Sequence, residues 1–297
     1  MKNENITGGK PKIVCVVGPT ASGKTAYAIE LAKRRGGEIV SCDSMQIYKY
    51  MDIGTAKPTA EERAEVPHHM IDFADPNTDY SVADFAARAR ECIDDILSRG
   101  RLPVLCGGTG LYIDSIISEV EYPENRRDDA LRTELWKMAE EDGAEAVHKI
   151  LENLDPEAAR NIHANNVKRV IRAIEICKTS GMTKTEADRL SVREPRYDAE
   201  IYGLTMDRER LYDRINKRVD MMMEQGLETE VRRLLDMGIR RNSTAMQAIG
   251  YKELIEYIDG ECSLCDAVEN IKRESRRYAK RQMTWFKRNK NIIWIER

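Results

Sequence analysis

Long apolar segments are missing from this sequence of 297 residues. No apolar run approaches the roughly 20 residues that a helix needs to cross a bilayer. The first residues, Met1 to Lys10, are polar, whereas a secretory signal peptide needs an apolar segment there. Internal repeats and low-complexity stretches are absent as well. We therefore expect a globular protein without a membrane partner.

The cysteines do not form the pattern of a disulfide framework. There are seven of them, an odd number in a chain without a signal peptide, and Cys15 and Cys106 lie in apolar runs typical of buried strands. Cys262 and Cys265 have the C-x-x-C spacing of many zinc sites, but no second pair of cysteines or histidines follows at zinc-finger distance. The sequence predicts reduced thiols, a cytoplasmic location and no zinc site.

Charge is unevenly distributed along the chain. The composition, 41% hydrophobic and 33% charged residues, is ordinary for a globular protein, and the net charge is −3. Acidic residues outnumber basic ones twelve to five between Glu121 and Glu157, whereas the segment from Lys272 to Lys290 holds nine basic residues and a single acidic one. A basic segment of this density is either a contact for a polyanion or one solvated face of a helix.

A phosphate-binding motif stands near the N-terminus. The apolar run Ile13–Val17 leads into a G-x-x-x-x-G-K-T segment, and a helix-compatible stretch, Ala26–Arg35, follows it. In such a loop the glycines let the backbone wrap around an anion, and the amides at the helix N-terminus point at it. The lysine adds a positive charge, and the final threonine is placed to hold Mg²⁺. The motif does not say whether a phosphoryl group is transferred. It predicts that a di- or triphosphate is bound by the residues of this loop: Gly18, Pro19, Thr20, Ala21, Ser22, Gly23, Lys24 and Thr25.

The order of apolar runs in the first part of the chain predicts an α/β fold. Strand patterns at Ile13–Val17, Glu38–Ser41 and Leu102–Cys106 alternate with helix patterns at Ala26–Arg35 and Val82–Arg99. This alternation is typical of a parallel, doubly wound sheet.

The rest of the chain is mostly helical in its pattern. Residues 125–190 show a helical period with little sign of strands, while Tyr202–Met206 and Ile292–Ile295 return to a strand pattern. Further helices are predicted at Arg208–Gln225, Leu227–Met237, Met246–Tyr257 and Ser263–Lys287. The predicted fold class is a P-loop NTPase-like parallel sheet core, residues 1–122 and 200–297, with an inserted all-helical domain, residues 123–199, and a helical C-terminal part.

A carboxylate follows the second predicted strand. Because parallel strands end at one edge of a sheet, we expect Asp43 to lie near the phosphate loop. There it either accepts a proton from an incoming nucleophile or serves as a turn or helix-cap residue, which is common after strands. The third strand ends in Gly107-Gly108-Thr109-Gly110 without an acid, and the α/β half lacks an arginine-rich lid. Both absences weaken an assignment as a small-molecule kinase without excluding it.

Two C-terminal segments are compatible with either packing or ligand binding. The segment from Lys280 to Lys287 interleaves cations with aromatic side chains. Its cations can pair with phosphates, while Trp285 or Phe286 either stacks on an unpaired base or packs in the core. Residues 247–252 form either a turn that begins a helix or a surface that offers Gln, Tyr and Lys to a ligand.

Taken together, these motifs resemble the tRNA dimethylallyltransferases, also called tRNA isopentenyltransferases or the IPP transferase family. The resemblance rests on segments that occur in the expected order over nearly the whole chain: the phosphate loop, Asp43–Tyr48, Met51–Pro58, Gly107–Tyr112, Gly250-Tyr251 and Lys280–Trp285. It implies transfer of a dimethylallyl group from dimethylallyl diphosphate to N6 of the adenine that follows the anticodon, in tRNAs reading codons that begin with U. The phosphate loop would then hold a leaving diphosphate, and the missing kinase features would have a reason.

The resemblance also implies roles for individual residues at the diphosphate. Lys24, the loop amides and a Mg²⁺ ion on Thr25 would stabilise the leaving group, with Arg214 as a further contact. Asp43 would accept the proton of the adenine amine as the new bond forms. The adenine must leave its stack to reach them, so contacts to this base or its neighbours are implied for Asp43, Ser44, Met45, Gln46 and Thr109.

Further contacts to tRNA are implied in the insertion and at the C-terminal helices. In the insertion they fall on Arg132, Lys168, Arg169, Val170, Ile171 and Arg172. In the C-terminal part they fall on Gln247, Ala248, Ile249, Gly250, Tyr251, Lys252, Lys280, Arg281, Gln282, Met283, Thr284, Trp285, Phe286 and Lys287.

Three alternatives stay open at this point. A nucleoside-phosphate or small-metabolite kinase shares the loop and the sheet and would bind ATP. An adenylate dimethylallyltransferase alkylates free AMP and would not need the basic, aromatic C-terminal segment. An RNA-binding protein gated by ATP would need no catalytic base. For the prenylating enzyme we expect tRNA and dimethylallyl diphosphate as partners, Mg²⁺ as cofactor and a monomeric chain.

Overall fold

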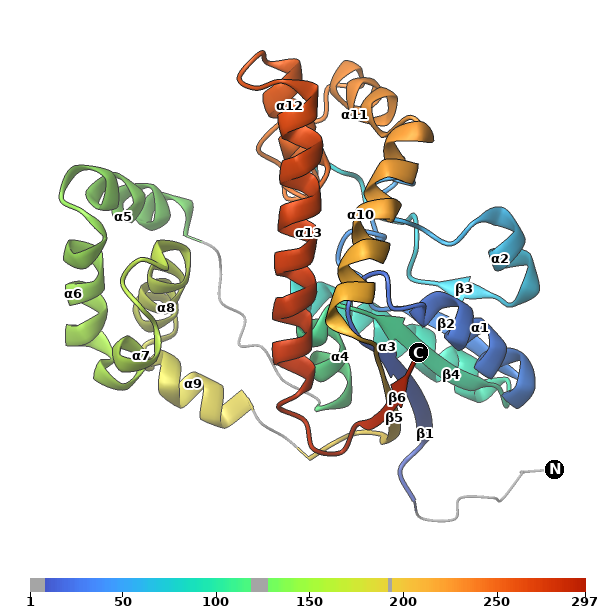
Figure 1. Ribbon diagram of the computed structural model, residues 1–297. Helices are drawn as coiled ribbons and strands as arrows, with labels where there is room; N and C mark the ends of the chain where they lie inside the picture. Colours follow the sequence, from blue (N-terminus) through green and yellow to red (C-terminus); the bar gives the residue numbers. More distant parts are fainter. Residues whose placement is uncertain (1–8, 119–127, 192–193) are drawn as a thin grey trace. The chain divides into compact units, whose positions relative to one another are not determined.

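The computed structural model describes residues 9–118, 128–191 and 194–297. The N-terminal residues 1–8 and the domain limit predicted at residues 122–123 lie outside this description. The chain divides into two compact units: Met1–Ile117 together with Arg196–Arg297, and Ser118–Pro195 between them (Figure 1).

A six-stranded sheet forms the centre of the first unit. Every neighbouring pair is parallel, and the strands follow the spatial order β3-β2-β4-β1-β5-β6. Because the strands before and after the inserted unit lie on opposite sides of β1, the strand order reverses there, and ligands of α/β sheets bind at the carboxyl ends near such a point. The predicted parallel α/β core is confirmed, with β1 Lys12–Val17, β2 Gly37–Ser41, β3 His68–His69, β4 Leu102–Gly107, β5 Asp198–Thr205 and β6 Ile293–Glu296.

The sequence of β1 shows why this sheet is buried on both faces. Val14 and Val16 belong to a core cluster with helix α1 (Lys24–Arg35). Ile13, Cys15 and Val17 belong to a second cluster with helix α3 (Val82–Ser98). Since successive side chains of a strand point to opposite faces, an unbroken apolar run suits a strand that helices cover on both sides.

The sequence pattern did not predict three short elements, and the first half of one predicted helix is not helical. The missed elements are α2 (Ala60–Glu65), β3 and α4 (Gly110–Ile117), each too short to show a clear period. The helix predicted over Met246–Tyr257 begins only at Tyr251, as α12 (Tyr251–Ile258). Residues 243–250 form turns instead, which end at Gly250 with a φ of 99°, a conformation that favours glycine.

Four helices, α10 (Arg208–Glu224), α11 (Leu227–Asp236), α12 and α13 (Leu264–Phe286), make up the C-terminal part of the first unit. The long helix α13 packs against α10, α12 and α4 (Figure 1). A buried carboxylate joins these helices to the loop after β2: Glu230 accepts hydrogen bonds from the amides of residues 52–54 and from the Tyr251 hydroxyl. Among the described residues, no helix has both the length and the apolarity needed to span a membrane.

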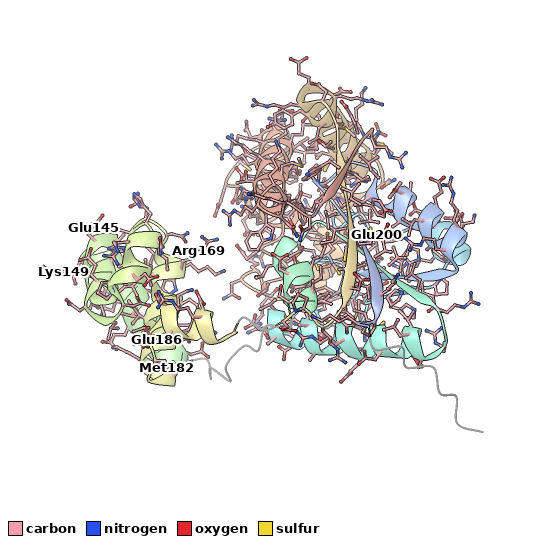
Figure 2. All side chains as sticks on the ribbon, turned by 90° about the horizontal axis from the view of Figure 1, so that it is seen from below. Glu145, Lys149, Arg169, Met182, Glu186 and Glu200 are labelled. Carbon is pink, nitrogen blue, oxygen red and sulfur yellow. The ribbon has the colours of Figure 1, made fainter. Side chains whose placement is uncertain are left out.

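The described part of the second unit is helical throughout. Its helices are α5 (Asp129–Glu141), α6 (Ala144–Leu154), α7 (Pro156–Asn161), α8 (Val167–Ser180) and α9 (Lys184–Ser191). They enclose a core of their own, built from side chains such as Leu135, Val147, Leu151 and Ile174. Charged side chains including Glu145, Lys149 and Arg169 project from these helices (Figure 2).

Candidate active site

A cavity of about 540 Å³ opens in the first unit, within the range typical of small-molecule sites. Its wall combines the phosphate loop, the segment after β2, the turn after β4, and the helices α10 and α13. The charged side chains of the wall are Lys24, Asp43, Glu62, Arg214, Arg218 and Arg281. Cations outnumber carboxylates in this set, so the cavity suits an anionic ligand.

The phosphate loop has the backbone that its glycines allow. Gly18 has a φ of 143°, and a Cβ atom there would lie 2.7 Å from the Leu204 carbonyl oxygen of β5. Gly23 has a φ of 89° at the start of α1, so both positions require glycine. Lys24 donates from Nζ to the Pro19 carbonyl oxygen at 2.6 Å, and burial lowers the pKa of this ammonium to about 8. A desolvated ammonium gains when an anion binds beside it.

Asp43 lies in the same wall as the phosphate loop. Its Oδ1 accepts a hydrogen bond from the Met45 amide at 2.9 Å, so it is a turn residue, and it also lines the cavity. Burial raises the pKa of Asp43, against the opposing effects of the Met45 amide and of the positive charges of Lys24 and Arg218. A carboxylate with a raised pKa is a stronger proton acceptor once it is ionised.

Arg218 is a site residue that the sequence reasoning missed. It lies one helical turn after Arg214 on α10, and both line the cavity. Its charge acts on Lys24 and on Asp43. Arg214 donates from Nε to the Ala21 carbonyl oxygen at 2.9 Å, which ties α10 to the phosphate loop. The i, i+4 spacing of the two arginines in a predicted helix was the available signal.

Helix α13 joins the phosphate loop to the glycine-rich turn after β4. The buried Gln282 accepts from the Thr20 amide at 2.8 Å and donates to the Gly108 carbonyl oxygen at 3.0 Å. A Cβ atom at Gly108 would clash with this Gln282 side chain, and one at Gly110 would clash with the Trp285 ring. The glycines of this turn therefore allow α13 to approach. Tyr278 lines the cavity from the same helix, and burial together with the charge of Asp43 raises its pKa to about 12.

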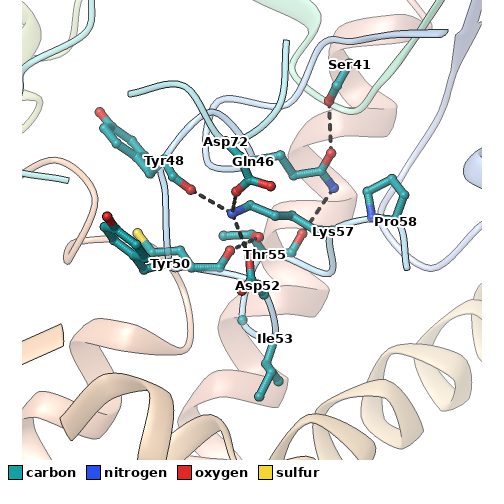
Figure 3. A network of polar contacts seen from close by, with 12 residues as sticks. Ser41, Gln46, Tyr48, Tyr50, Asp52, Ile53, Thr55, Lys57, Pro58 and Asp72 are labelled. Atoms are coloured by element: carbon teal, nitrogen blue, oxygen red, sulfur yellow. Dashed lines mark hydrogen bonds and ion pairs between the residues drawn. The ribbon is translucent and has the colours of Figure 1, made fainter. Parts of the chain in front are cut away.

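A polar network fixes the loop that follows Asp43 (Figure 3). The Gln46 amide accepts from Ser41 Oγ at 2.9 Å and donates to the carbonyl oxygens of Thr55 and Ala56. The buried Lys57 ammonium donates to the Tyr48 carbonyl oxygen at 2.7 Å and pairs with Asp52 and Asp72.

The Gln46 side chain lines the cavity, but its amide is used to hold this loop. Ser44 is held by a bond from its amide to Thr109 Oγ1 at 3.3 Å.

Four of the predicted tRNA contacts have buried side chains, and these contacts stay predictions. Val170 and Ile171 lie in the core of the second unit, and Tyr251 and Phe286 lie in that of the first. Their apolar period follows the buried face of a helix, which is why neighbours of exposed cations are core residues. Ala248 is buried too, although it lines the cavity together with Gln247, Ile249 and Gly250.

The cations of the insertion fall into two groups. Arg132 and Arg172 both pair with the carboxylate of Glu175, whose side chain is fully buried, and they lower the pKa of Glu175 to about 2 against the effect of its burial. Lys168 and Arg169 are exposed at the start of α8. Of these four cations, Lys168 and Arg169 are therefore the ones that are exposed and do not pair with Glu175.

The C-terminal segment is divided in a similar way. Lys280, Arg281, Thr284 and Lys287 are exposed, and Lys252 and Met283 are partly exposed. Trp285 donates from Nε1 to Asp114 Oδ2 at 2.8 Å, so the polar end of its ring is anchored inside the protein. The packing interpretation of Trp285 and Phe286 therefore agrees with the structure, while Lys280, Arg281 and Lys287 are exposed.

The residues around Thr25 fit a magnesium ion that is held mainly by its ligand. No group of three or more His, Cys, Asp or Glu side chains able to hold a metal occurs among the described residues. Mg²⁺ commonly keeps several waters and binds through one or two protein oxygens plus substrate phosphates. The Thr25 hydroxyl, in the wall of the cavity, offers one such oxygen.

Comparison with known proteins identifies close relatives over almost the full chain. A model of the IPP transferase family matches residues 46–289, and a model of isopentenyl transferases matches residues 11–72. The tRNA dimethylallyltransferase of Acetivibrio thermocellus is 52% identical over 96% of this chain and 91% of its own length. That of Bacillus cytotoxicus is 53% identical over 97% of this chain and 90% of its own length.

Solved structures agree with these sequence relatives. The tRNA isopentenylpyrophosphate transferase of Bacillus halodurans is 49% identical, with a TM-score of 0.73 over 97% of this chain and 90% of its own. A eukaryotic dimethylallyltransferase, solved acting on tRNA, is 28% identical, with a TM-score of 0.81 over 96% of this chain and 74% of its own. The likeness confirms the predicted P-loop NTPase-like α/β fold.

Proposed function

The chain belongs to the IPP transferase family and is a tRNA dimethylallyltransferase, and on this premise we propose how its cavity carries out the transfer. The donor is dimethylallyl diphosphate, and the acceptor is N6 of the adenine that follows the anticodon in tRNAs reading codons that begin with U. The observation that carries the mechanism is the shared wall of one cavity, in which Asp43 lies with Lys24 and Thr25 of the phosphate loop.

The phosphate loop and its arginines take the leaving group. As the bond between the allylic carbon and the diphosphate oxygen breaks, its electron pair goes to the diphosphate. The negative charge that grows there is stabilised by the amides at the start of α1, by Lys24, and by Arg214 and Arg218 one helical turn apart. Donors that are fixed before the reaction need no reorganisation, so this set contributes most in the transition state.

Asp43 takes the proton. The nitrogen lone pair of the adenine amine forms the new bond to the allylic carbon, and the N6 proton passes to the Asp43 carboxylate. The raised pKa of Asp43 supports this role, because its conjugate acid is less acidic than an ordinary aspartic acid. Because the exocyclic amine is a weak nucleophile, correct positioning of base and allylic carbon matters most. The Met45 amide and the Gln46 network support such positioning.

Magnesium would be held by the Thr25 hydroxyl together with the diphosphate oxygens, and when bound it supplies positive charge to the leaving group. The exposed cations Lys280 and Arg281 on α13, Lys287 just after it, and Lys168 and Arg169 on α8 would contact tRNA phosphates. Action as a monomer in the cytoplasm stays a prediction of the sequence.

Mass spectrometry of tRNA nucleosides tests the proposed donor and acceptor. The protein is incubated with Mg²⁺, unmodified tRNA and dimethylallyl diphosphate, and in parallel with ATP in place of the donor or with AMP in place of tRNA. We expect dimethylallyl adenosine from tRNA in the first mixture alone. Phosphate transfer from ATP would indicate the kinase instead, and alkylation of AMP without that of tRNA would indicate an adenylate dimethylallyltransferase. The relatives favour neither of these two activities.

A further inference from the structure

Helix α10 carries a regular series of cavity residues. Arg214, Arg218 and Met222 follow one another at intervals of four residues, and all three line the cavity. Residues four apart lie one above the other on a helix face, so the series runs along one side of α10. The hydrogen bond from Arg214 to the Ala21 carbonyl oxygen fixes the start of the series at the phosphate loop, and Arg218 lines the cavity one helical turn further on.

The far end of this series is apolar. Beside Met222, the wall continues with Val219 of the same helix, Ile249 of the turn before α12 and Ile271 of α13. Val219 and Ile271 are buried, and Met222 and Ile249 are partly buried and pack against the same hydrophobic cluster. The cavity therefore has a cationic end at the phosphate loop and an apolar end about two helical turns away.

A prenyl diphosphate has the same division, a charged head and a hydrocarbon tail. We propose that the apolar end around Met222 and Ile249 holds the tail of the donor, and that Met222 limits the length of the prenyl chain. This inference rests on the proposed function, since it assigns the head of the donor to the phosphate loop. The class of ligand is an allylic diphosphate with a five-carbon tail.

The spacing along α10 supports a limit of one isoprene unit. With a rise of 1.5 Å per residue, Met222 lies about 6 Å along the helix from Arg218. The four-carbon main chain of a dimethylallyl group, with three C–C bonds of about 1.5 Å in a zigzag, extends roughly 4 Å. A second isoprene unit would need about the same length again, and Met222 lines the cavity in this direction along α10.

Three consecutive methionines offer a matched set of variants. Met222 lines the cavity, whereas Met221 is 55% exposed and Met223 packs against the core without lining the cavity. Each is changed singly to Ala, and kcat/KM for alkylation of tRNA is measured with dimethylallyl diphosphate and with geranyl diphosphate. Discrimination by hydrophobic pockets is commonly about 10- to 200-fold per methylene. We therefore expect Met222→Ala to raise the ratio of geranyl to dimethylallyl kcat/KM at least tenfold, and Met221→Ala and Met223→Ala to leave it unchanged.

A second variant at the same position keeps the inference testable if Met222→Ala does not fold. Met222→Phe keeps the site apolar but fills it, and should lower kcat/KM for dimethylallyl diphosphate while the KM for tRNA stays as in the wild type. An unchanged donor ratio in a folded Met222→Ala protein would overturn the inference. A raised KM for tRNA with unchanged donor selectivity would overturn it too, because the apolar end would then hold the adenine. If the wild-type protein fails to alkylate tRNA with dimethylallyl diphosphate, the proposed function itself fails, which is a different result.

Discussion

Replacement of Asp43 by Asn is the most direct test of the proposed mechanism. Asn has nearly the same shape as Asp, and its side-chain oxygen can still accept the Met45 amide, which Asp43 does at 2.9 Å. The turn is thus kept, while the group that accepts the proton is lost. A positioned general base contributes about 10²- to 10⁴-fold to the rate, which corresponds to roughly 3–5 kcal/mol of activation free energy.

The appropriate assay is a single-turnover reaction with enzyme in excess over labelled tRNA, because it isolates the chemical step from product release. In the wild type, the rate should fall as the pH drops through the pKa of Asp43, because the protonated carboxyl cannot accept a proton. This acid limb should lie above the ordinary aspartate pKa of about 3.9, because burial raises the pKa of Asp43. In Asp43→Asn the small residual rate should lose this limb, while the Kd for tRNA stays within a few-fold of the wild type.

Stability provides the control for this variant. Because the pKa of Asp43 is raised on folding, its ionised carboxylate is less favoured in the folded protein than in the unfolded chain. At pH values above the raised pKa, this ionised group therefore lowers the stability of the native state. The neutral Asn removes this cost, so thermal unfolding at pH 7 should occur at an equal or higher temperature. A variant that keeps more than a third of the wild-type single-turnover rate would refute the role of Asp43 as the base.

Three further predictions concern the surface and the packing of the site. The double variant Lys280→Ala/Lys287→Ala changes two exposed residues that do not line the cavity. In a filter-binding titration it should lower the slope of log Kd for tRNA against log salt concentration by about 1.5, and an unchanged slope would exclude these contacts. Gln282→Leu leaves the partly buried Thr20 amide and the buried Gly108 carbonyl without their side-chain partner, and should reduce the free energy of unfolding by about 3 kcal/mol in urea. A loss below about 1 kcal/mol would show that these two hydrogen bonds contribute little. Gly107→Ala drives a methyl group into the Cys42 carbonyl and should cost about 2 kcal/mol or more by the same measurement, so a neutral outcome would mean that β2 and β4 can separate there.

Local sequence was sufficient for the features that depend on short segments. The phosphate loop is one continuous segment whose glycines meet the backbone demands of that segment itself, and the apolar period of β1 is visible without any partner. Asp43 could be placed near the loop because parallel strands end at one edge, a rule that holds for any such sheet. The family resemblance extended these local inferences to the activity.

Tertiary structure decided what depends on residues far apart in the chain. Arg218 and Met222 are ordinary helix residues until α10 is set against the phosphate loop, and Gln282 connects to Thr20 across almost the full length of the sequence. The same packing buries the side chains of four residues for which the resemblance implied RNA contacts: Val170, Ile171, Tyr251 and Phe286. The physical reason is that burial and cavity shape depend on how separate elements pack together, and a one-dimensional pattern records only which side chains could take part.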